Sequence, residues 1–405
     1  MYNNDYIKFF FFKNQEIIKE EKLNNDILDY ILKYLILFFI KSTVICCSNY
    51  SFLLDNNKIY VTGSNEYGQL GLGEYKYNNY ERIDNINCIK HFKKNEFFKD
   101  EIILSISLGH DYVIILTNKG VYSMGSSHEG QLGTGYSGNM NVYLPEKIKF
   151  FNNKEIKNIS CGGSHNIIIT KNNKIYVFGC NHQGQLGLGD DNNRYNPVEI
   201  FLSSSIVVSA SCGDVHSLIL TSDGLYGAGG NSKGQLGLGF YSKKYNYNFT
   251  KLKFFDNMEI MEIYCGLYYS IVLLKNNELY GMGDNEYYKL GIDEDISNII
   301  NPTKIKFDHK VLSLYCGYKN TFILSDEGCL YFTGCDDNIK GNYAFSKVFI
   351  KINFFDKMKI ISIGIGLNHI LVLTETGLYG KGNTKYGQLG ISNLEKIDDY
   401  SLIPI

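Results

Sequence analysis

Three of the eight histidines recur at one position of a repeated pattern. His165, His216 and His369 each lie three residues after a glycine that ends an apolar run. Histidine binds metals and transfers protons near neutral pH, but equivalent positions of a repeat are spread through a fold, so three such rings cannot meet at one ion. We expect structural hydrogen bonds here, and neither a metal site nor a cofactor. The other copies carry Tyr50, Tyr112, Tyr269 and Asn320 at this position.

Five of the ten cysteines share another position, at the end of the first apolar run in a copy: Cys46, Cys161, Cys212, Cys265 and Cys316. A small thiol suits a crowded inner strand. The sequence contains no Cys-x-x-Cys pair, and Cys329 and Cys335 lack a histidine pair at zinc-finger spacing. We therefore expect packed, reduced thiols in an intracellular protein, cytoplasmic or nuclear.

A sevenfold repeat positions these residues. Its period is about 50 residues, the range of propellers and arrays of small sheets. In most copies Gln-Leu-Gly or a decayed form follows about six residues after a strand-ending glycine. The glycines are Gly63, Gly125, Gly179, Gly229, Gly283, Gly334 and Gly382.

The third copy defines the unit. Residues 156–162, 164–170 and 175–179 read as strands rich in apolar β-formers, and Asn172-Asn173 suits a two-residue hairpin. A fourth strand is expected at residues 197–201. All four prolines, Pro145, Pro197, Pro302 and Pro404, are expected at the first residue of such a strand. The pattern predicts an all-β fold, a seven-bladed β-propeller of four-stranded blades.

The two ends of the chain predict how the ring closes. The sequence Phe-Phe-Lys-Asn-Gln-Glu-Ile at residues 11–17 copies segments near the fourth strands, and Ile403-Pro404-Ile405 stops where a fourth strand is expected to begin. We expect residues 6–12 to pair with the last blade, because an open ring would leave an exposed strand edge. The chain is then one domain, with a closing strand in 1–18, a helical insertion in 19–43 and seven repeats in 44–405.

The insertion at 19–43 carries apolar residues at helical spacing after Asn24, Asn25 and Asp26, which could cap a helix. A helix packed on a blade edge is favoured over a partner-binding helix. Its apolar stretch Leu35–Ile40 is too short to span a bilayer. The net charge of −2 argues against bulk electrostatic binding of nucleic acid, and we expect a monomer.

The Gly-rich loop that follows the third strand could suggest a phosphate site. Such a site needs its glycines between a strand and a helix N-terminus, and no helical pattern follows the loop. We expect the glycines to form tight turns and the loop leucines to pack between neighbouring blades: Leu70, Leu132, Leu186, Leu236, Leu290 and Leu389.

The repeat resembles that of the regulator of chromosome condensation family, as in CGGSHNIIITKNNKIYVFGCNHQGQLGLGD at 161–190. The resemblance is strong in repeats 1 to 4 and 7, weaker in repeat 5 and nearly lost in repeat 6, where Asp336–Gly341 replaces the loop. It implies a propeller used as a recognition surface and, in the founding member, nucleotide exchange on the GTPase Ran. Light sensing, known in a plant ultraviolet-B receptor of this family, needs tryptophans, and the chain has none.

Function is then expected from residues that differ between copies at one mouth of the ring. The candidate partner-binding residues, which follow the first strands, are His110, Asp111, Ser164, Asp214, Tyr268, Lys319 and Asn368. In the exchange factor that the chain resembles, acidic residues of such loops engage the GTPase; Asp111 and Asp214 lie in corresponding loops, although solvated carboxylates would give the same pattern. Three differences from that factor weaken the exchange assignment. Tyr269 and Asn320 stand where the factor has a histidine from a later repeat. The chain also has no wedge-like loop insertion and no basic tail.

These residues predict a protein-interaction platform, with exchange activity toward a Ran-like GTPase as the alternative. The loop histidines His110, His128 and His182 are free to serve recognition. No nucleophile, base and orienting group can be assembled from spacing, so we do not expect an enzyme in the catalytic sense.

Overall fold

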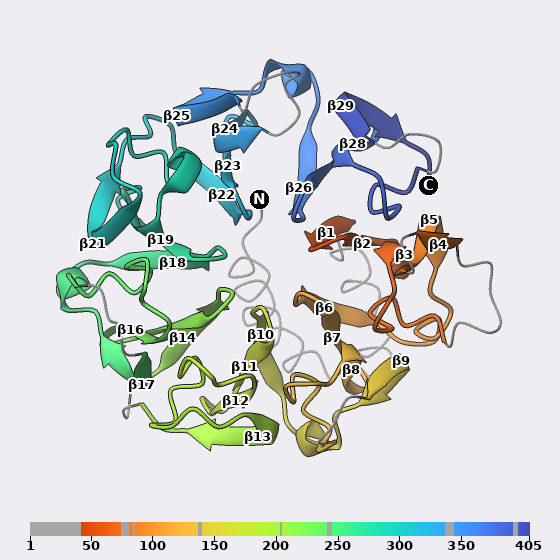
Figure 1. Cartoon of the computed structure of the whole chain (residues 1–405), viewed down its shortest axis with the longest axis horizontal. Coiled ribbons are helices and arrows are strands. Elements are labelled where there is room, and N and C mark those ends of the chain that lie inside the picture. The colour runs from red at the N-terminus through yellow and green to blue at the C-terminus, as the bar shows by residue number, and fades with distance from the viewer. Residues whose placement is uncertain are drawn as a thin grey trace, which may run out of the picture.

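The computed structural model describes residues 42–73, 81–83, 86–136, 140–202, 205–240, 245–336, 344–391 and 396–405. Seven antiparallel sheets stand around a central axis like the blades of a propeller (Figure 1). Six sheets have four strands, and the first has a fifth, β4 (Glu81–Ile83), beyond its outer strand. The seven-bladed architecture predicted from the repeat is confirmed. No helix among these residues is long and apolar enough to cross a bilayer.

The first two strands of each blade form a hairpin, with the first strand nearest the axis (Figure 1). The first strands are β1 (Thr43–Cys47), β6 (Ile103–Leu108), β10 (Ile156–Cys161), β14 (Val207–Cys212), β18 (Ile260–Cys265), β22 (Val311–Cys316) and β26 (Ile360–Ile365). The second strands are β2 (Tyr50–Asp55), β7 (Tyr112–Thr117), β11 (His165–Thr170), β15 (His216–Thr221), β19 (Tyr269–Leu274), β23 (Asn320–Ser325) and β27 (His369–Thr374).

The third strand returns beside the second, and the outer strand forms the rim. The third strands are β3 (Lys58–Ser64), β8 (Gly120–Ser126), β12 (Ile175–Gly179), β16 (Gly224–Gly229), β20 (Leu279–Asp284), β24 (Leu330–Asp336) and β28 (Gly377–Asn383). The outer strands are β5 (Ile86–Lys94), β9 (Asn141–Lys147), β13 (Arg194–Ile200), β17 (Asn246–Lys251), β21 (Asn298–Ile305), β25 (Ala344–Lys351) and β29 (Lys396–Ile403).

The sequence predicted that the prolines begin the outer strands, and this prediction is wrong. Pro145, Pro197 and Pro302 lie inside β9, β13 and β21, at the point where pairing with the third strand shifts register. A proline has no N–H to donate, so an outer strand with an irregularity tolerates it. Pro404 follows β29.

The outer strand of the seventh blade also differs from the prediction. The C-terminal residues form β29, which pairs with β28, so the seventh blade completes its four strands from its own repeat. Residues 6–12, expected to supply that strand, lie outside the described residues, as does nearly all of the insertion at 19–43. The first and seventh blades meet side by side, where Ser362 Oγ lies 2.8 Å from Thr43 Oγ1 and Leu367 N donates to Ser48 O at 2.9 Å.

The repeated Phe-Phe segments are short 3-10 turns after the outer strands. They are η2 (Lys149–Phe151), η3 (Lys253–Phe255) and η5 (Asn353–Phe355), and a further turn, η4 (Glu286–Tyr288), lies in the loop of the fifth blade. The second phenylalanine of each Phe-Phe pair is buried: Phe151, Phe255 and Phe355. These segments therefore anchor the crossing from one blade to the next.

Asparagine in the turns between second and third strands also links neighbouring blades through its side chain. The two-residue hairpin predicted at Asn172-Asn173 is a longer loop, in which Thr170 N donates to Lys174 O and only Asn173 has a positive φ. The Asn56-Asn57 turn does have two left-handed residues. In turn, Asn173 Oδ1 accepts the N–H of Val207 on the next blade at 2.6 Å. Asn57 and Asn277 make the same link to the following blades, which explains asparagine where glycine would also fit.

The hydrophobic core is divided into seven clusters, one between each pair of neighbouring blades. The loop leucines pack there as predicted and are 0–1% exposed: Leu70, Leu132, Leu186, Leu236, Leu290 and Leu389. Each comes from one blade and contacts the next; Leu186, for example, packs with Val207 and Ile219. Burying a leucine contributes about 1.5–3 kcal/mol, so these loops hold the ring together.

A hydrogen-bonded relay accompanies the leucines. His165 Nε2 lies 2.8 Å from Ser217 Oγ, and that hydroxyl donates to the carbonyl of Gln185 at 2.7 Å. Because the serine proton goes to the carbonyl, the histidine must donate from Nε2, which fixes its tautomer. His216 with Ser270 and His369 with Ser51 repeat the arrangement. The structural role expected for these three histidines is confirmed.

Candidate functional site

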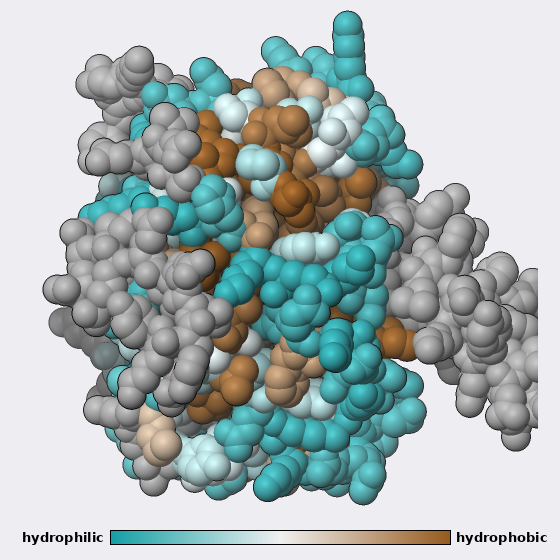
Figure 2. Space-filling view, turned by 90° about the vertical axis from the view of Figure 1, so that its right-hand side faces the viewer, coloured by the Kyte–Doolittle hydropathy of each residue, from teal (hydrophilic) through white to brown (hydrophobic). Residues whose placement is uncertain are grey.

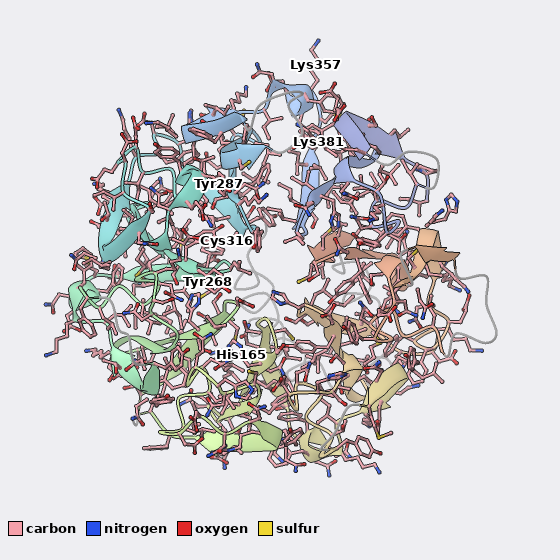
Figure 3. All side chains as sticks on the ribbon, viewed as in Figure 1. His165, Tyr268, Tyr287, Cys316, Lys357 and Lys381 are labelled. Carbon is pink, nitrogen blue, oxygen red and sulfur yellow. The ribbon has the colours of Figure 1, made fainter. Side chains whose placement is uncertain are left out.

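The central channel opens at the face where first and second strands are joined. A cavity of about 230 Å³ there is lined by residues of all seven blades. The residues that directly follow the first-strand glycine, or Cys47 in the first blade, border it: Ser48, His110, Gly163, Asp214, Leu267, Tyr318 and Leu367. We call these seven residues the mouth ring. Cys316 and Tyr268 lie close to the channel, whereas Lys357 projects from the rim (Figure 3).

Backbone hydrogen bonds hold much of the mouth ring in one geometry. His110 N donates to Gly163 O at 3.1 Å, and Gly163 N donates to Gly213 O at 3.2 Å. The bonds from Asp214 N to Leu267 O and from Leu367 N to Ser48 O continue the pattern. The frame is therefore repeated from blade to blade, while the side chains it presents differ.

Three of the predicted site residues are brought together at this mouth. His110 Nε2 lies 3.4 Å from Asp214 Oδ1, although the residues belong to the second and fourth blades. The third blade permits this contact because Gly163 has no side chain: a Cβ at that position would lie 2.3 Å from Asp214 Oδ1. Burial raises the pKa of Tyr268, and the charge and hydrogen bond of Asp214 raise it further, so Tyr268 remains a neutral donor to this carboxylate.

Asp111 lies beside this group. Its burial raises the pKa of the carboxyl above the usual value, and the neighbouring His110 and His128 act in the opposite direction. Asp111 and Asp214 thus share the mouth face, as expected, but their surroundings differ. Asp214 is held between a histidine and a tyrosine, whereas Asp111 is partly removed from water.

The remaining predicted residues are placed elsewhere on this face. Lys319 and Asn368 line a separate cavity of about 200 Å³ between the sixth and seventh blades, and Lys319 Nζ lies 5.8 Å from the centre of the Tyr287 ring. Ser164 lies at the start of the third blade's second strand, where its carbonyl accepts the N–H of Cys180 at 2.8 Å. His110, Asp214 and Tyr268 therefore form a compact group with Asp111 beside it. Ser164, Lys319 and Asn368 lie apart from it.

The cysteines at the ends of the first strands are structural, as expected. Cys161, Cys212 and Cys265 each donate from Sγ to a serine carbonyl of the preceding blade at 3.3–3.5 Å. Burial raises the pKa of each of these thiols to about 12. They are protonated at neutral pH and are poor nucleophiles. All ten cysteines belong to the described residues and are present as thiols.

Sequence reasoning missed one group of side chains on the mouth face. Glu129 comes from the loop of the second blade, and Cys180 and His182 follow β12 of the third blade; their ligand atoms lie within 4.8 Å of one another. The signal available in the sequence was the Cys-x-His spacing of residues 180 and 182. Glu129 could not be joined to it without knowledge of which loops meet.

The outer wall of the ring is less distinctive than the mouth. In Figure 2, which shows the side that carries β5 and β9, hydrophobic groups gather in the upper part of the view, and hydrophilic groups cover its middle. Exposed apolar residues on outer strands include Leu144 and Leu402. Scattered apolar side chains are normal on protein surfaces, so the polar, charged mouth remains the better candidate for a site.

The closed ring of four-stranded sheets defines a repeat protein of the β-propeller class. The model of the RCC1-like domain matches residues 33–323. The chain therefore belongs to the RCC1-like domain family, as the repeat motif had indicated.

Relatives with known names share this domain. The chain is similar to the human X-linked retinitis pigmentosa GTPase regulator, at 32% identity over 69% of this chain and 26% of that protein. It is also similar to the Arabidopsis thaliana ultraviolet-B receptor UVR8, at 29% identity over 72% of this chain and 56% of the receptor. The first curated relatives are longer: the chain spans 16–62% of their length.

Solved structures agree on the fold. Human WBSCR16 superposes with a TM-score of 0.72 at 22% identity, covering 86% of this chain and 94% of that structure. Prp20p of Saccharomyces cerevisiae, which binds Gsp1p and histones, gives a TM-score of 0.72 at 19% identity, covering 90% of this chain and 88% of that structure. At these identities the similarity shows the architecture alone.

Proposed function

We propose that the chain is a protein-interaction platform that binds its partner through the mouth face. The observation that carries this proposal is the contrast within the mouth ring. Backbone hydrogen bonds repeat from blade to blade, yet the residues they present include histidine, aspartate, tyrosine, leucine and glycine. A uniform frame with varied side chains gives a surface its own chemical identity, and function in such folds depends on the site rather than on the fold.

The His110–Asp214–Tyr268 group is the proposed centre of this surface. A carboxylate that is 14% exposed and is contacted by an imidazole and a phenol is held in a defined position. A partner that places an arginine or lysine beside it gains a charge-assisted hydrogen bond. A few residues near the centre of an interface carry most of the binding energy, and truncating one of these costs about 2 kcal/mol or more.

The test compares matched substitutions in binding to a purified partner. Asp214→Asn keeps the shape of the side chain and removes its charge, and the control Asp256→Asn makes the same change at a rim ion pair with Lys251. We expect Asp214→Asn to weaken binding at least about tenfold and the control to leave it unchanged. Equal affinity for Asp214→Asn and wild type, with loss in the control, would place the interface outside the mouth.

Nucleotide exchange on a Ran-like GTPase is the second candidate function. It is favoured by the presence of Asp111 and Asp214 on one face and by the similarity to a GTPase regulator. An exchange factor must bind the nucleotide-free GTPase more tightly than the loaded form, and carboxylates near the phosphate or Mg²⁺ site would favour that state. A binding platform has no need of this preference.

Release of fluorescent GDP from a Ran-like GTPase separates the two functions. With catalytic amounts of this protein, exchange activity predicts faster release that is reduced in Asp214→Asn and Asp111→Asn. Release at the intrinsic rate would eliminate exchange on that GTPase and leave the binding platform. Affinity capture with and without EDTA would then identify the partner, since EDTA removes Mg²⁺ and favours the nucleotide-free GTPase.

A further inference from the structure

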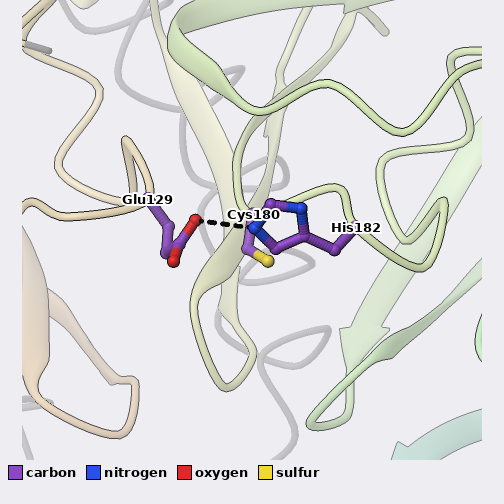
Figure 4. A group of neighbouring side chains, drawn as sticks. All are labelled: Glu129, Cys180 and His182. Carbon is purple, nitrogen blue, oxygen red and sulfur yellow. Dashed lines mark hydrogen bonds and ion pairs between the residues drawn. The ribbon is translucent and has the colours of Figure 1, made fainter.

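The group of Glu129, Cys180 and His182 unites three kinds of metal ligand on two blades. Glu129 Oε2 lies 3.1 Å from His182 Nε2, and Cys180 Sγ lies within 4.8 Å of both ligand atoms (Figure 4). In a tetrahedral zinc site with bond lengths of about 2.0–2.3 Å, ligand atoms lie roughly 3–4 Å apart. Only small side-chain movements are needed to reach that geometry.

Neighbouring residues already hold these ligands in place. Cys180 N donates to Ser164 O at 2.8 Å. Asn193 Nδ2 donates to Glu129 Oε2, and Asn193 Oδ1 accepts the N–H of Asn181 at 2.8 Å. The amide of Asn193 therefore connects the carboxylate of one blade to the loop that carries Cys180 and His182. Such supporting hydrogen bonds orient metal ligands and raise metal affinity.

The donor set also selects the type of ion. A thiolate and an imidazole are soft or borderline ligands that favour zinc and similar transition metals over Mg²⁺ and Ca²⁺. Among the described residues, one group brings at least three His, Cys, Asp or Glu ligand atoms within 4.8 Å of one another, and it is Glu129, Cys180 and His182. A second His–Glu pair, His309 with Glu327 at 3.8 Å, belongs to no such group and offers a natural comparison.

We propose that Glu129, Cys180 and His182 bind one zinc ion, or a similar transition-metal cation, at the junction of the second and third blades on the mouth face. The cation displaces the thiol proton of Cys180 to solvent. The Nε2 proton that His182 shares with Glu129 also leaves to solvent, the neutral ring keeps its proton on Nδ1, and the Glu129–His182 contact gives way to two metal–ligand bonds. Three protein ligands leave one position of a tetrahedral ion open. Water or a side chain of a bound partner fills that position.

Cobalt titration of the 405-residue chain tests the coordination directly. The protein is first treated with chelator, freed of it, and kept in a reductant that does not contain a thiol. We expect saturation at one Co²⁺ for each chain, with a thiolate-to-metal charge-transfer band and the intense visible bands of a tetrahedral site. Zinc is expected to abolish these bands by displacing cobalt. A protein without the charge-transfer band, or one whose band survives excess zinc, overturns the proposal.

Substitutions then assign the ligands. Cys180→Ser is expected to remove the charge-transfer band. Cys180→Ser, His182→Gln and Glu129→Gln are each expected to weaken zinc binding by more than about tenfold in competition with a chromophoric chelator, because losing only a group that supports a ligand already costs about 10–100-fold. His309→Gln and Cys329→Ser are the controls and are expected to bind as the wild type does. Because His182 is largely exposed, His182→Gln remains informative even if Cys180→Ser folds poorly. Unchanged zinc affinity in His182→Gln overturns the assignment.

Thermal unfolding supplies an independent readout. A ligand that binds only the folded state raises the melting temperature by mass action. Zinc is expected to raise it in the wild type and in both controls, and to have little effect in the three ligand variants. A rise of equal size in every variant would mean that zinc binds elsewhere. This outcome does not depend on whether the mouth face binds a protein.

Discussion

The junction between the third and fourth blades and the junction between the sixth and seventh are built from the same repeat, yet they are held differently. At the first, His165 donates to Ser217, Ser217 donates to the carbonyl of Gln185, and Leu186 packs below them. At the second, Asn320 bonds instead to Cys335 O at 3.2 Å within its own blade, and Ile370 occupies the position of the serine. The relay therefore ends at the sixth blade.

The loop sequence also changes in the sixth repeat. Repeat 6 has no Gln-Leu-Gly sequence, so the leucine that packs between neighbouring blades in the other copies is missing from its loop. Lys381 stands where Thr62 and Thr333 bond to the loop of a preceding blade in other copies. Aromatic residues, among them Phe322 and Phe355, fill much of this junction, and the cavity of about 200 Å³ remains.

The fifth blade shows the opposite outcome, because a changed motif is compensated. Lys289 replaces glutamine in the loop, and Asp284 receives it in an ion pair of 2.8 Å whose side chains are 4% and 6% exposed. Asp284 Oδ1 also accepts the N–H of Glu286 at 3.0 Å, much as the loop glutamines accept backbone N–H groups elsewhere. The carbonyl of Lys289 still accepts from Thr321. The hydrogen bond to the loop carbonyl is therefore kept although lysine replaces glutamine.

The largest effect is expected from breaking this buried ion pair. Lys289→Gln leaves Asp284 charged and buried without its partner, which should lower the free energy of unfolding by about 3–5 kcal/mol. Adding Asp284→Ser restores the pairing of residues found in the second blade, Ser126 with Gln131, and should recover most of the loss. Denaturant unfolding of both variants measures this. Equal destabilisation in the single and double variants would contradict the compensation.

Acid is expected to weaken the intact junctions selectively. Burial lowers the pKa of His165, His216 and His369 to about 3, against about 6.5 in an unfolded chain. Between those values the unfolded chain binds the proton and the folded chain does not, so stability is full above pH 6.5 and falls as the pH drops toward 3. Each histidine should cost about 2 kcal/mol between pH 6.5 and 5.

Unfolding as a function of pH checks this, with His216→Gln as the variant. Its stability should be lower than that of wild type at pH 7 but should decline less steeply between pH 6.5 and 5. Parallel curves for the two proteins would mean that His216 is not held neutral in the folded chain.

Removing one hydroxyl compares the two junctions directly. Ser217→Ala leaves both the His165 donor and the Gln185 carbonyl without their partner and should cost about 1–3 kcal/mol. Asn320→Ala removes a half-buried bond within one blade and should cost less than about 1 kcal/mol. Denaturant midpoints report the difference. A larger loss in Asn320→Ala would show that the sixth junction depends on this residue after all.

The smallest effect is expected from supplying the missing histidine alone. In Asn320→His the ring would face Ile370, which has no hydroxyl to accept its proton. We therefore expect no gain, with a change in unfolding free energy within about 0.5 kcal/mol. A clear rise in melting temperature would mean that a histidine can link these blades without the loop motif.

The blade architecture was readable from the sequence because each repeat encodes its own hairpins. The strand-ending glycines and loop leucines recur at fixed offsets, and each satisfies a local requirement of turn geometry or apolar burial. The outer strand of the seventh blade was placed wrongly because the sequence places a proline after residues 396–403 and resembles earlier segments only weakly there. The prolines were assigned to strand starts because a register shift inside an outer strand leaves no mark in spacing.

The sequence by itself determined seven blades, a buried leucine in each complete loop and a structural position for three histidines. These features follow from periodicity, since a repeated local pattern produces a repeated local structure. Only the tertiary structure decided that His110 reaches Asp214 across Gly163, that Glu129 meets Cys180 and His182, and that the relay ends at Ile370. Such contacts join different repeats, and the closure of the ring in three dimensions sets their distances.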